Sequence, residues 1–138
     1  MTVKFDTETI RLITFFENFT GVSVKDCLVG DNCIYFIVEE GKVGIAIGRN
    51  GSSVKNVERM VGRSIKLFEF SNDLNVFVKK LIPQVNGIKI RDENGKVIVD
   101  IKVEKKNRAL VIGRDGRNLK VFKKLLQRTH NVNELIIR

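Results

Sequence analysis

The sequence predicts an α+β fold, with helices layered on sheets, built from two tandem units of the same element order. Each unit is expected to run helix, strand, strand, helix, helix, strand. The first observation behind this prediction is a repeat, because Ile47–Gly51 (Ile-Gly-Arg-Asn-Gly) returns as Ile112–Gly116 (Ile-Gly-Arg-Asp-Gly), 65 positions later. The second is a hairpin pattern ahead of each copy, and the third is the length. A chain of 138 residues accommodates two small units, predicted as 1–70 and 71–138.

Local signals place each element of the first unit in turn. Asp6 is suited to cap a helix, an apolar face follows it, and Gly21 ends that helix. Two runs rich in β-branched and aromatic residues then flank a turn, Gly30-Asp31-Asn32. The predicted elements are a helix from Asp6 to Gly21, strands Val22–Val29 and Cys33–Val38, helices Lys42–Ile47 and Ser52–Val61, and a strand Arg63–Phe70.

The second unit follows without a linker rich in Gly, Ser or Pro. Ser71 is predicted to cap a helix with regular apolar spacing, and Pro83 closes that helix. Asn94-Gly95 is a strong signal for a two-residue hairpin turn. The remaining predicted elements are strands Ile88–Glu93 and Lys96–Val103, helices Glu104–Ile112 and Arg117–Arg128, and a last strand Val132–Ile137.

The net positive charge is confined to the second unit. The chain carries 25 Lys and Arg against 16 Asp and Glu, a net charge of +9. Nine cations and nine anions balance within residues 1–70, so the whole excess lies in residues 71–138. A basic half beside a neutral half indicates a polyanionic partner, with nucleic acid favoured over a membrane surface.

Each Gly-X-X-Gly segment lies between two predicted helices. Glycine permits a sharp turn there, and the helix that follows presents free N–H groups and its positive dipole end. Such a loop suits phosphates, and Arg49 and Arg114 place charge beside it. The plain alternative is a tight helix–helix turn, which the duplication of the whole context disfavours. Neither copy has the Lys-Ser/Thr pair of a Walker A loop or the leading strand of a dinucleotide-binding fingerprint.

A basic stripe on the predicted helix Arg117–Arg128 is a separate signal. The stripe comprises Arg117, Lys120, Lys124 and Arg128, and the opposite, apolar face comprises Leu119, Phe122 and Leu126. A solvated helix face would explain it too, but such a face is typically balanced by acids, and this helix contains none. Phosphate contact is therefore the preferred interpretation.

Metal, cofactor and catalytic sites are not expected. Cys27 and Cys33 are too few for a disulfide framework and are interpreted as packed hairpin residues. The one histidine, His130, is interpreted as a surface turn residue. No arrangement of carboxylates, nucleophile and base, or metal ligands converges in the sequence, so an enzyme is not expected. A sequence without a signal peptide or an apolar run of about 20 residues predicts a cytoplasmic protein.

Both units resemble KH domains, a module whose Gly-X-X-Gly loop clamps the backbone of about four nucleotides. The resemblance rests on Ile47–Gly51 and Ile112–Gly116, on the flanking apolar helices, and on Gly62–Leu67, which is similar to the strand entry of such domains. The element order resembles the prokaryotic, type II, form. Two such units in tandem, covering nearly the whole chain, resemble the archaeal NusA-like proteins. That resemblance implies single-stranded RNA binding in transcription termination, antitermination or elongation control.

The resemblance also implies which residues contact RNA. Backbone N–H groups of the two loops hold the sugar-phosphate chain, nearby cations neutralise phosphates, and bases lie over an apolar groove. The loop residues are Gly48, Arg49, Asn50 and Gly51 in the first unit and Gly113, Arg114, Asp115 and Gly116 in the second. The further cations are Lys55, Arg117, Lys120 and Lys124. The groove residues are Ile47, Val54 and Ile65 in the first unit and Ile112 and Leu119 in the second. The second loop has Asp115 where the first has Asn50, and a carboxylate that faces phosphates weakens binding. We therefore expect the first unit to recognise a short RNA sequence and the second unit to hold the RNA backbone.

A protein–protein adaptor of the transcription or translation machinery is the alternative. In that hypothesis the loops are structural and the basic surface meets an acidic partner such as RNA polymerase. Salt-sensitive RNA binding would separate the two, because phosphate neutralisation releases counterions. Neither hypothesis requires a small-molecule substrate, a cofactor or a membrane, and a monomer is expected.

Overall fold

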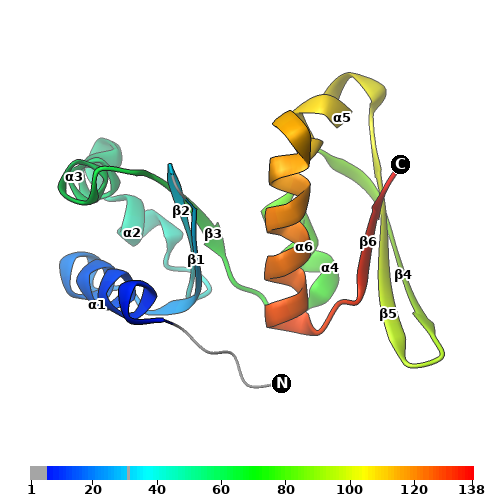
Figure 1. Ribbon diagram of the computed structural model, residues 1–138, viewed down its shortest axis with the longest axis horizontal. Coiled ribbons are helices and arrows are strands. Elements are labelled where there is room, and N and C mark those ends of the chain that lie inside the picture. Colours follow the sequence, from blue (N-terminus) through cyan, green and yellow to red (C-terminus); the bar gives the residue numbers. More distant parts are fainter. Residues whose placement is uncertain (1–5, 31) are drawn as a thin grey trace. The chain divides into compact units, whose positions relative to one another are not determined.

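Each half of the chain forms a three-stranded sheet with helices on one face (Figure 1). The computed structural model describes residues 6–30 and 32–138 of this α+β protein. The chain divides into a unit that ends at Phe70 and a unit that spans Ser71–Arg138. Of the predicted turn between the first two strands, Asp31 lies outside the described residues. Within the described part, we find no helix with the length and apolar character that a membrane span requires.

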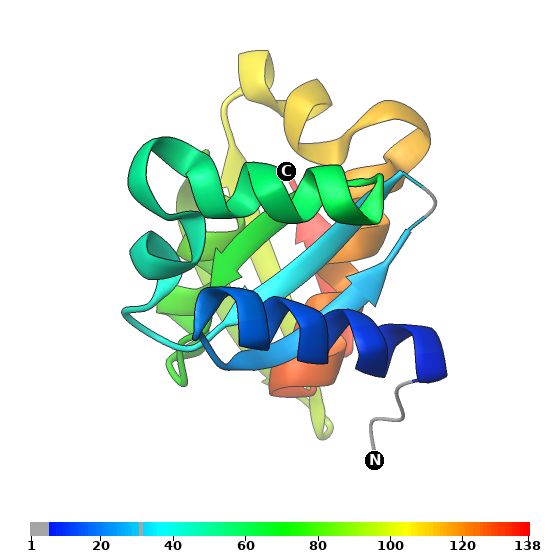
Figure 2. The same cartoon turned by 90° about the vertical axis from the view of Figure 1, so that its left-hand side faces the viewer.

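The described residues of the first unit form three α-helices, a 3₁₀ turn and three strands. Strand β2 is central: it pairs antiparallel with β1 and parallel with β3, with Ile34 opposite Ile65. Figure 2 looks onto the helices of this unit, where α1 and α3 lie across the sheet and contact each other. The elements are α1 (Thr7–Thr20), β1 (Val24–Val29), β2 (Cys33–Val38), α2 (Val43–Ile47), η1 (Arg49–Gly51), α3 (Ser52–Val61) and β3 (Ser64–Glu69).

The second unit has the same element order and sheet pattern. Its central strand β5 pairs antiparallel with β4 and parallel with β6. Asn94 and Gly95 both have positive φ, 54° and 81°, as the predicted two-residue hairpin turn requires. The elements are α4 (Leu74–Leu81), β4 (Val85–Glu93), β5 (Lys96–Val103), α5 (Lys105–Ile112), η2 (Arg114–Gly116), α6 (Arg117–His130) and β6 (Glu134–Ile137).

Two of the predicted helix boundaries illustrate where local signals succeed and fail. Asp6 is confirmed as the N-cap of α1, because its carboxylate accepts a 2.7 Å hydrogen bond from the Thr9 N–H. The prediction that Ser71 caps α4 is wrong. Asp73 caps that helix by accepting from the Val76 N–H at 3.1 Å, and the Ser71 hydroxyl accepts from the Asp73 N–H instead. Ser71 is buried, so it fixes the turn ahead of the helix.

Helix α6 is longer than its counterpart α3, so the two units keep the 65-residue offset only as far as these helices. Helix α3 has 10 residues and ends at Gly62, whereas α6 has 14 and ends at Asn131; both end residues are left-handed. The loops align 65 positions apart, but the strands that follow the two helices do not. As a result, Arg63 lies beyond the end of α3, while Arg128 lies inside α6.

The core of the first unit lies between its sheet and helices. Phe16 of α1 stacks on Phe36 of β2 with ring centroids 4.2 Å apart, and Ala46 of α2 and Val57 of α3 join the same cluster. Cys27 is 1% exposed and belongs to this core, as predicted for a packed cysteine. In the second unit, residues from the sheet and from α4 and α6 are buried: Phe77, Val78, Leu81, Val99, Ile101, Leu125 and Leu126. These cores hold the loop between the second and third helices at one end of each unit.

Candidate nucleic-acid interface

The two Gly-X-X-Gly loops adopt the same backbone conformation. In each, the first glycine ends a helix, a 3₁₀ turn follows, and the last glycine precedes the next helix. The last glycine donates to the carbonyl of the first at 3.2 Å in both copies. In the first loop, the φ/ψ values are 77°/177° at Gly48, 54°/30° at Asn50 and 73°/13° at Gly51. In the second loop, they are 78°/170° at Gly113, 55°/27° at Asp115 and 72°/18° at Gly116.

The first glycine of each loop is required by packing as well as by its positive φ. A Cβ on Gly48 would lie 2.9 Å from the Ser53 backbone nitrogen, and one on Gly113 would lie 3.0 Å from that of Asn118. The last glycines, Gly51 and Gly116, have positive φ too, but a Cβ there would meet open space, apart from a lysine carbon 3.8 Å away at Gly51. Helices therefore approach each other closely at the first glycine only.

The residue directly before the last glycine of each loop contributes to the backbone turn. Asn50 and Asp115 are both left-handed, a conformation that Asn and Asp adopt more readily than other non-glycine residues. The difference between an amide and a carboxylate at this place is therefore compatible with one loop geometry. Both side chains are exposed.

Helices α3 and α6 begin without a side-chain cap, unlike α1 and α4. Their N-cap residues are Gly51 and Gly116, and neither helix has an acid in its first turn. By contrast, aspartate carboxylates occupy the cap positions of α1 and α4. First-turn N–H groups that lack such an acceptor are suited to an external anion, and the helix dipole favours negative charge there.

Most of the cations predicted to contact phosphate are exposed near the loops. Arg49 and Lys55 lie on the first loop and the first turn of α3, and Arg114 and Lys120 hold the matching places in the second unit. Arg117 is the first residue of α6, where α3 has Ser52. Lys124 is exposed one turn further along α6.

Arg128 departs from the basic stripe that the sequence predicts. Its side chain is half-buried, and atoms of its guanidinium are shielded from solvent. The solvent-facing stripe of α6 therefore ends at Lys124.

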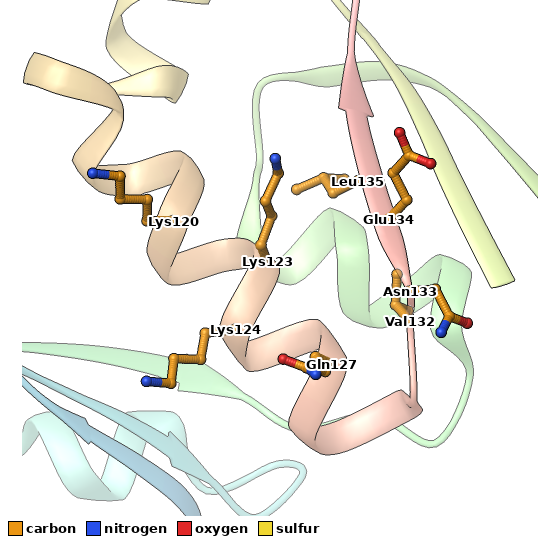
Figure 3. A pocket seen from close by; sticks show the side chains of 8 residues that line it. All are labelled: Lys120, Lys123, Lys124, Gln127, Val132, Asn133, Glu134 and Leu135. Atoms are coloured by element: carbon orange, nitrogen blue, oxygen red, sulfur yellow. The ribbon is translucent and has the colours of Figure 1, made fainter. Parts of the chain in front are cut away.

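A groove between α6 and β6 extends the second loop's basic surface (Figure 3). It encloses about 370 Å³, and Leu135 points from β6 toward α6 across it, while Glu134 points away. Lys120 and Lys124 were predicted for this surface, but the other lining residues were not: Lys123, Gln127, Val132, Asn133, Glu134 and Leu135. Lys123 could have been found one turn from Lys120, whereas the strand residues depend on which strand lies beside α6.

The predicted apolar groove residues differ in exposure. Ile47 is 38% exposed, and Val54, Ile112 and Leu119 are half-buried. Ile65 is only 8% exposed and belongs to the core of the first unit, so it offers little surface to a base.

Sequence reasoning missed two further aliphatic residues beside the loops. Ile45 in α2 and Leu110 in α5 hold matching places three positions before the first glycine, and they are 56% and 64% exposed. Exposed large aliphatics at the same place in both units extend the apolar surface next to each loop. Their shared position in the repeat was a signal that could have identified them.

His130 is not the surface turn residue that the sequence suggested. It is the last residue of α6, half-buried, and its ring stacks on Phe77 of α4 with centroids 4.7 Å apart. Its Nε2 lies 2.7 Å from the Ser71 carbonyl oxygen, and its Nδ1 lies 2.8 Å from the Thr129 hydroxyl. It therefore joins the end of α6 to the start of the second unit.

No metal-ligand cluster of three or more His, Cys, Asp or Glu occurs within residues 6–30 and 32–138. Cys33 is half-buried, and burial raises the pKa of its thiol above the usual range. A thiol in that state is a poor nucleophile at neutral pH.

Comparison with known proteins agrees with this geometry. A family model of the KH domain matches residues 11–83, which include the first loop. A probable transcription termination protein NusA of Methanocaldococcus jannaschii is 33% identical over 135 residues, which cover 96% of this chain and 74% of that protein. The chain belongs to the archaeal NusA-like family.

Other members of the NusA-like family align along almost their whole length. A probable transcription termination protein NusA of Halococcus morrhuae is 30% identical, with 98% of both chains covered. The crystal structure of APE1850 is similar too, with a TM-score of 0.81 and 35% identity over 97% of this chain and 100% of that chain. The second loop of this NusA-like chain lies outside the residues that the KH model matches.

Proposed function

We propose that this NusA-like chain is a non-enzymatic, single-stranded RNA-binding transcription factor that acts in termination, antitermination or elongation control. Its two units act as tandem type II KH domains, 1–70 and 71–138, each holding RNA backbone at its Gly-X-X-Gly loop. The observation that carries this proposal is the matched pair of loops. The φ/ψ values of the two loops agree within about 10°. Each loop leads into a helix that has no side-chain N-cap and no acidic residue in its first turn. The relatives' names supply the link to transcription termination.

The proposed mechanism follows from the chemistry of each loop. The N–H groups at the start of α3 and α6 hydrogen-bond phosphate oxygens, and glycine allows the nucleic acid backbone to approach closely. The flanking cations Arg49 and Lys55, and Arg114, Arg117, Lys120 and Lys124, neutralise phosphates. Bases then lie over the aliphatic surface beside each loop: Ile47 and Val54 in the first unit, and Ile112 and Leu119 in the second. Ile45 and Leu110 add to this surface.

We propose that the two units make different contributions to RNA binding. The first loop carries the neutral Asn50, and its unit has no net charge, so bases rather than charge dominate its selectivity. The second loop carries Asp115, but the cations on α6 offset its negative charge. This unit therefore contributes mainly salt-sensitive affinity for the RNA backbone. RNA polymerase remains a second proposed partner, reached through the same basic surface.

The test is a fluorescence-anisotropy titration with a pool of single-stranded RNAs of about 10 to 12 nucleotides, which contain more than the about four nucleotides that one clamp holds. The loop variant Arg49→Asp/Arg114→Asp is compared with wild type at two salt concentrations. A matched control, Arg11→Asp/Lys79→Asp, makes the same charge change at exposed sites on α1 and α4. We expect the loop variant to lose binding and the control to keep most of it.

Two outcomes would contradict the proposal. If the folded loop variant binds as tightly as wild type, the basic stripe alone attracts the polyanion and no clamp exists. If wild type fails to bind RNA, the adaptor hypothesis takes its place and a polymerase pull-down follows. Variants with one loop changed then measure how much of the RNA affinity each unit contributes.

A further inference from the structure

The second unit carries another basic surface, on the face of its sheet that the helices do not cover. Figure 1 shows α4 and α6 on one side of this sheet. Side chains alternate between the two faces of a strand, and residues directly opposite each other point the same way. Val99 and Ile101 are buried, so Asp100 and Lys102 face outward from β5. Lys89 is paired with Asp100 and lies on this outer face too.

Four cations lie around Asp100 on this outer face, and a second acid, Glu93, pairs with Arg91. Lys89 and Arg91 come from β4, Lys102 from β5, and Arg138 directly follows β6. With Asp100, they line a hollow of about 540 Å³ that spans three strands. We name this hollow the sheet pocket. It is separate from the groove in Figure 3, which lies between α6 and β6.

The acid in the sheet pocket is covered by arginines, so the pocket presents positive charge. The Arg138 Nε donates to both Asp100 carboxylate oxygens, at 3.0 and 3.1 Å, and Arg91 lies 3.9 Å from the same carboxylate. The Asp100 side chain is only 13% exposed, whereas that of Arg138 is 62% exposed. The carboxylate therefore orients the two guanidinium groups. Arg91 pairs with Glu93 as well, whereas the exposed side of the Arg138 guanidinium is open to an approaching anion.

We propose that the sheet pocket binds the phosphate backbone of a second stretch of RNA, apart from the stretch held by the two loops. This inference goes beyond the proposed loop function and rests on it only for the choice of RNA as the polyanion. Lys89 and Arg91 lie two residues apart on one strand face, about 6.8 Å at the usual rise per residue. This separation is comparable to that of consecutive phosphates in an extended strand.

The composition of the pocket favours nucleic acid over an acidic protein. Interfaces with proteins concentrate aromatic and apolar residues at the centre and deplete charged ones there. Nucleic-acid interfaces are more polar and far more positive. In the described chain, the centre of the sheet pocket is an ion-paired cluster of Arg91, Asp100 and Arg138, and its lining contains no aromatic residue.

The test removes two charges that do not orient the arginines. In Lys89→Gln/Lys102→Gln, both exposed lysines of the pocket become neutral, and the ion pairs of Asp100 remain. The matched control, Lys42→Gln/Lys79→Gln, neutralises two exposed lysines elsewhere. Each variant is titrated with an RNA of about five nucleotides, which suits one clamp, and with one of about 20 nucleotides.

We expect the pocket variant to bind the short RNA like wild type and the long RNA about tenfold more weakly at about 0.1 M salt. The slope of log K against log salt for the long RNA should fall by about 1.4, because two phosphate contacts on a single strand are lost. In wild type, NMR amide shifts of Lys89 and Lys102 should move with the long RNA alone.

Three results would overturn the inference. The first is unchanged affinity and salt slope with the long RNA, whether or not the variant then loses an acidic protein partner. The second is an equal loss with short RNA, and the third is an equal loss in the control pair. Failure of the proposed loop function would look different from failure of the sheet-pocket proposal. In that case, the Arg49→Asp/Arg114→Asp protein would bind the short RNA as tightly as wild type.

Discussion

Asn50 and Asp115 occupy the same left-handed backbone position, with φ of 54° and 55°, in two loops that otherwise match. One residue is neutral, and the other is an anion at a surface that the proposal assigns to phosphates. Because Asn and Asp both tolerate this conformation, the exchange between them changes charge without changing the loop. This pair therefore allows loop electrostatics to be tested without loop strain.

Asp115→Asn should strengthen RNA binding and leave stability unchanged. Unit charges about 4 Å apart in water interact by about 1 kcal/mol, so removing the repulsion should raise affinity up to about fivefold at low salt. The gain should shrink as salt increases. Anisotropy titrations measure the affinity, and thermal unfolding checks the stability. Unchanged or weaker binding would show that the Asp115 side chain points away from the RNA.

The two glycines of the second loop should differ in their tolerance of alanine. Gly116→Ala should lower the free energy of unfolding by about 1 to 2 kcal/mol, the penalty for a left-handed alanine. Gly113→Ala adds overlap with Asn118 and should lower it by about 1 to 3 kcal/mol more. Urea unfolding of the two variants, side by side, measures the difference. Equal destabilisation would contradict the close packing at Gly113.

His130 should stabilise the second unit. His130→Ala removes the stacking on Phe77 and the hydrogen bond to the Ser71 carbonyl, and should lower the free energy of unfolding by about 1 to 3 kcal/mol. Gln127→Ala, an exposed position one turn earlier on α6, is the control and should change stability little. A double-mutant cycle with Phe77→Leu isolates the ring contact. Additive effects in that cycle would rule the stacking out.

The Asp6 cap predicts a specific acid sensitivity. Hydrogen bonds from Thr9 hold the pKa of Asp6 below its ordinary value of 3.8. A carboxyl group whose pKa is lower in the folded state stabilises that state above its unfolded pKa, and this stabilisation is lost as the pH falls through the folded pKa. Asp6→Asn, which keeps a neutral cap, should therefore lose less stability than wild type between about pH 5 and pH 2. Parallel acid dependence of unfolding in both proteins would refute this.

Much of the fold could be predicted because its signals are local. Strands β2 and β5 and helix α3 have the predicted boundaries, since β-branched runs, glycines and the Asn94-Gly95 turn act within a few residues. The start of α4 was misplaced because two neighbouring residues, Ser71 and Asp73, both suit a cap, and burial of Ser71 decided between them. Strand β4 begins three residues earlier than predicted, at Val85, because pairing with β5 extends it through a bulge near Gly87.

The sequence by itself determined that the chain repeats one order of elements, that each copy contains a glycine loop between helices, and that the net charge belongs to the second copy. Those features depend on residue type and spacing alone. Only the tertiary structure decided that β6 lies beside α6 to form a groove, that Arg128 and Ile65 are covered, and that His130 stacks on Phe77. It also brought Lys89, Lys102 and Arg138 around Asp100. Pairing of strands and packing of helices set these relationships, and most of them join residues far apart in the chain, so no local pattern encodes them.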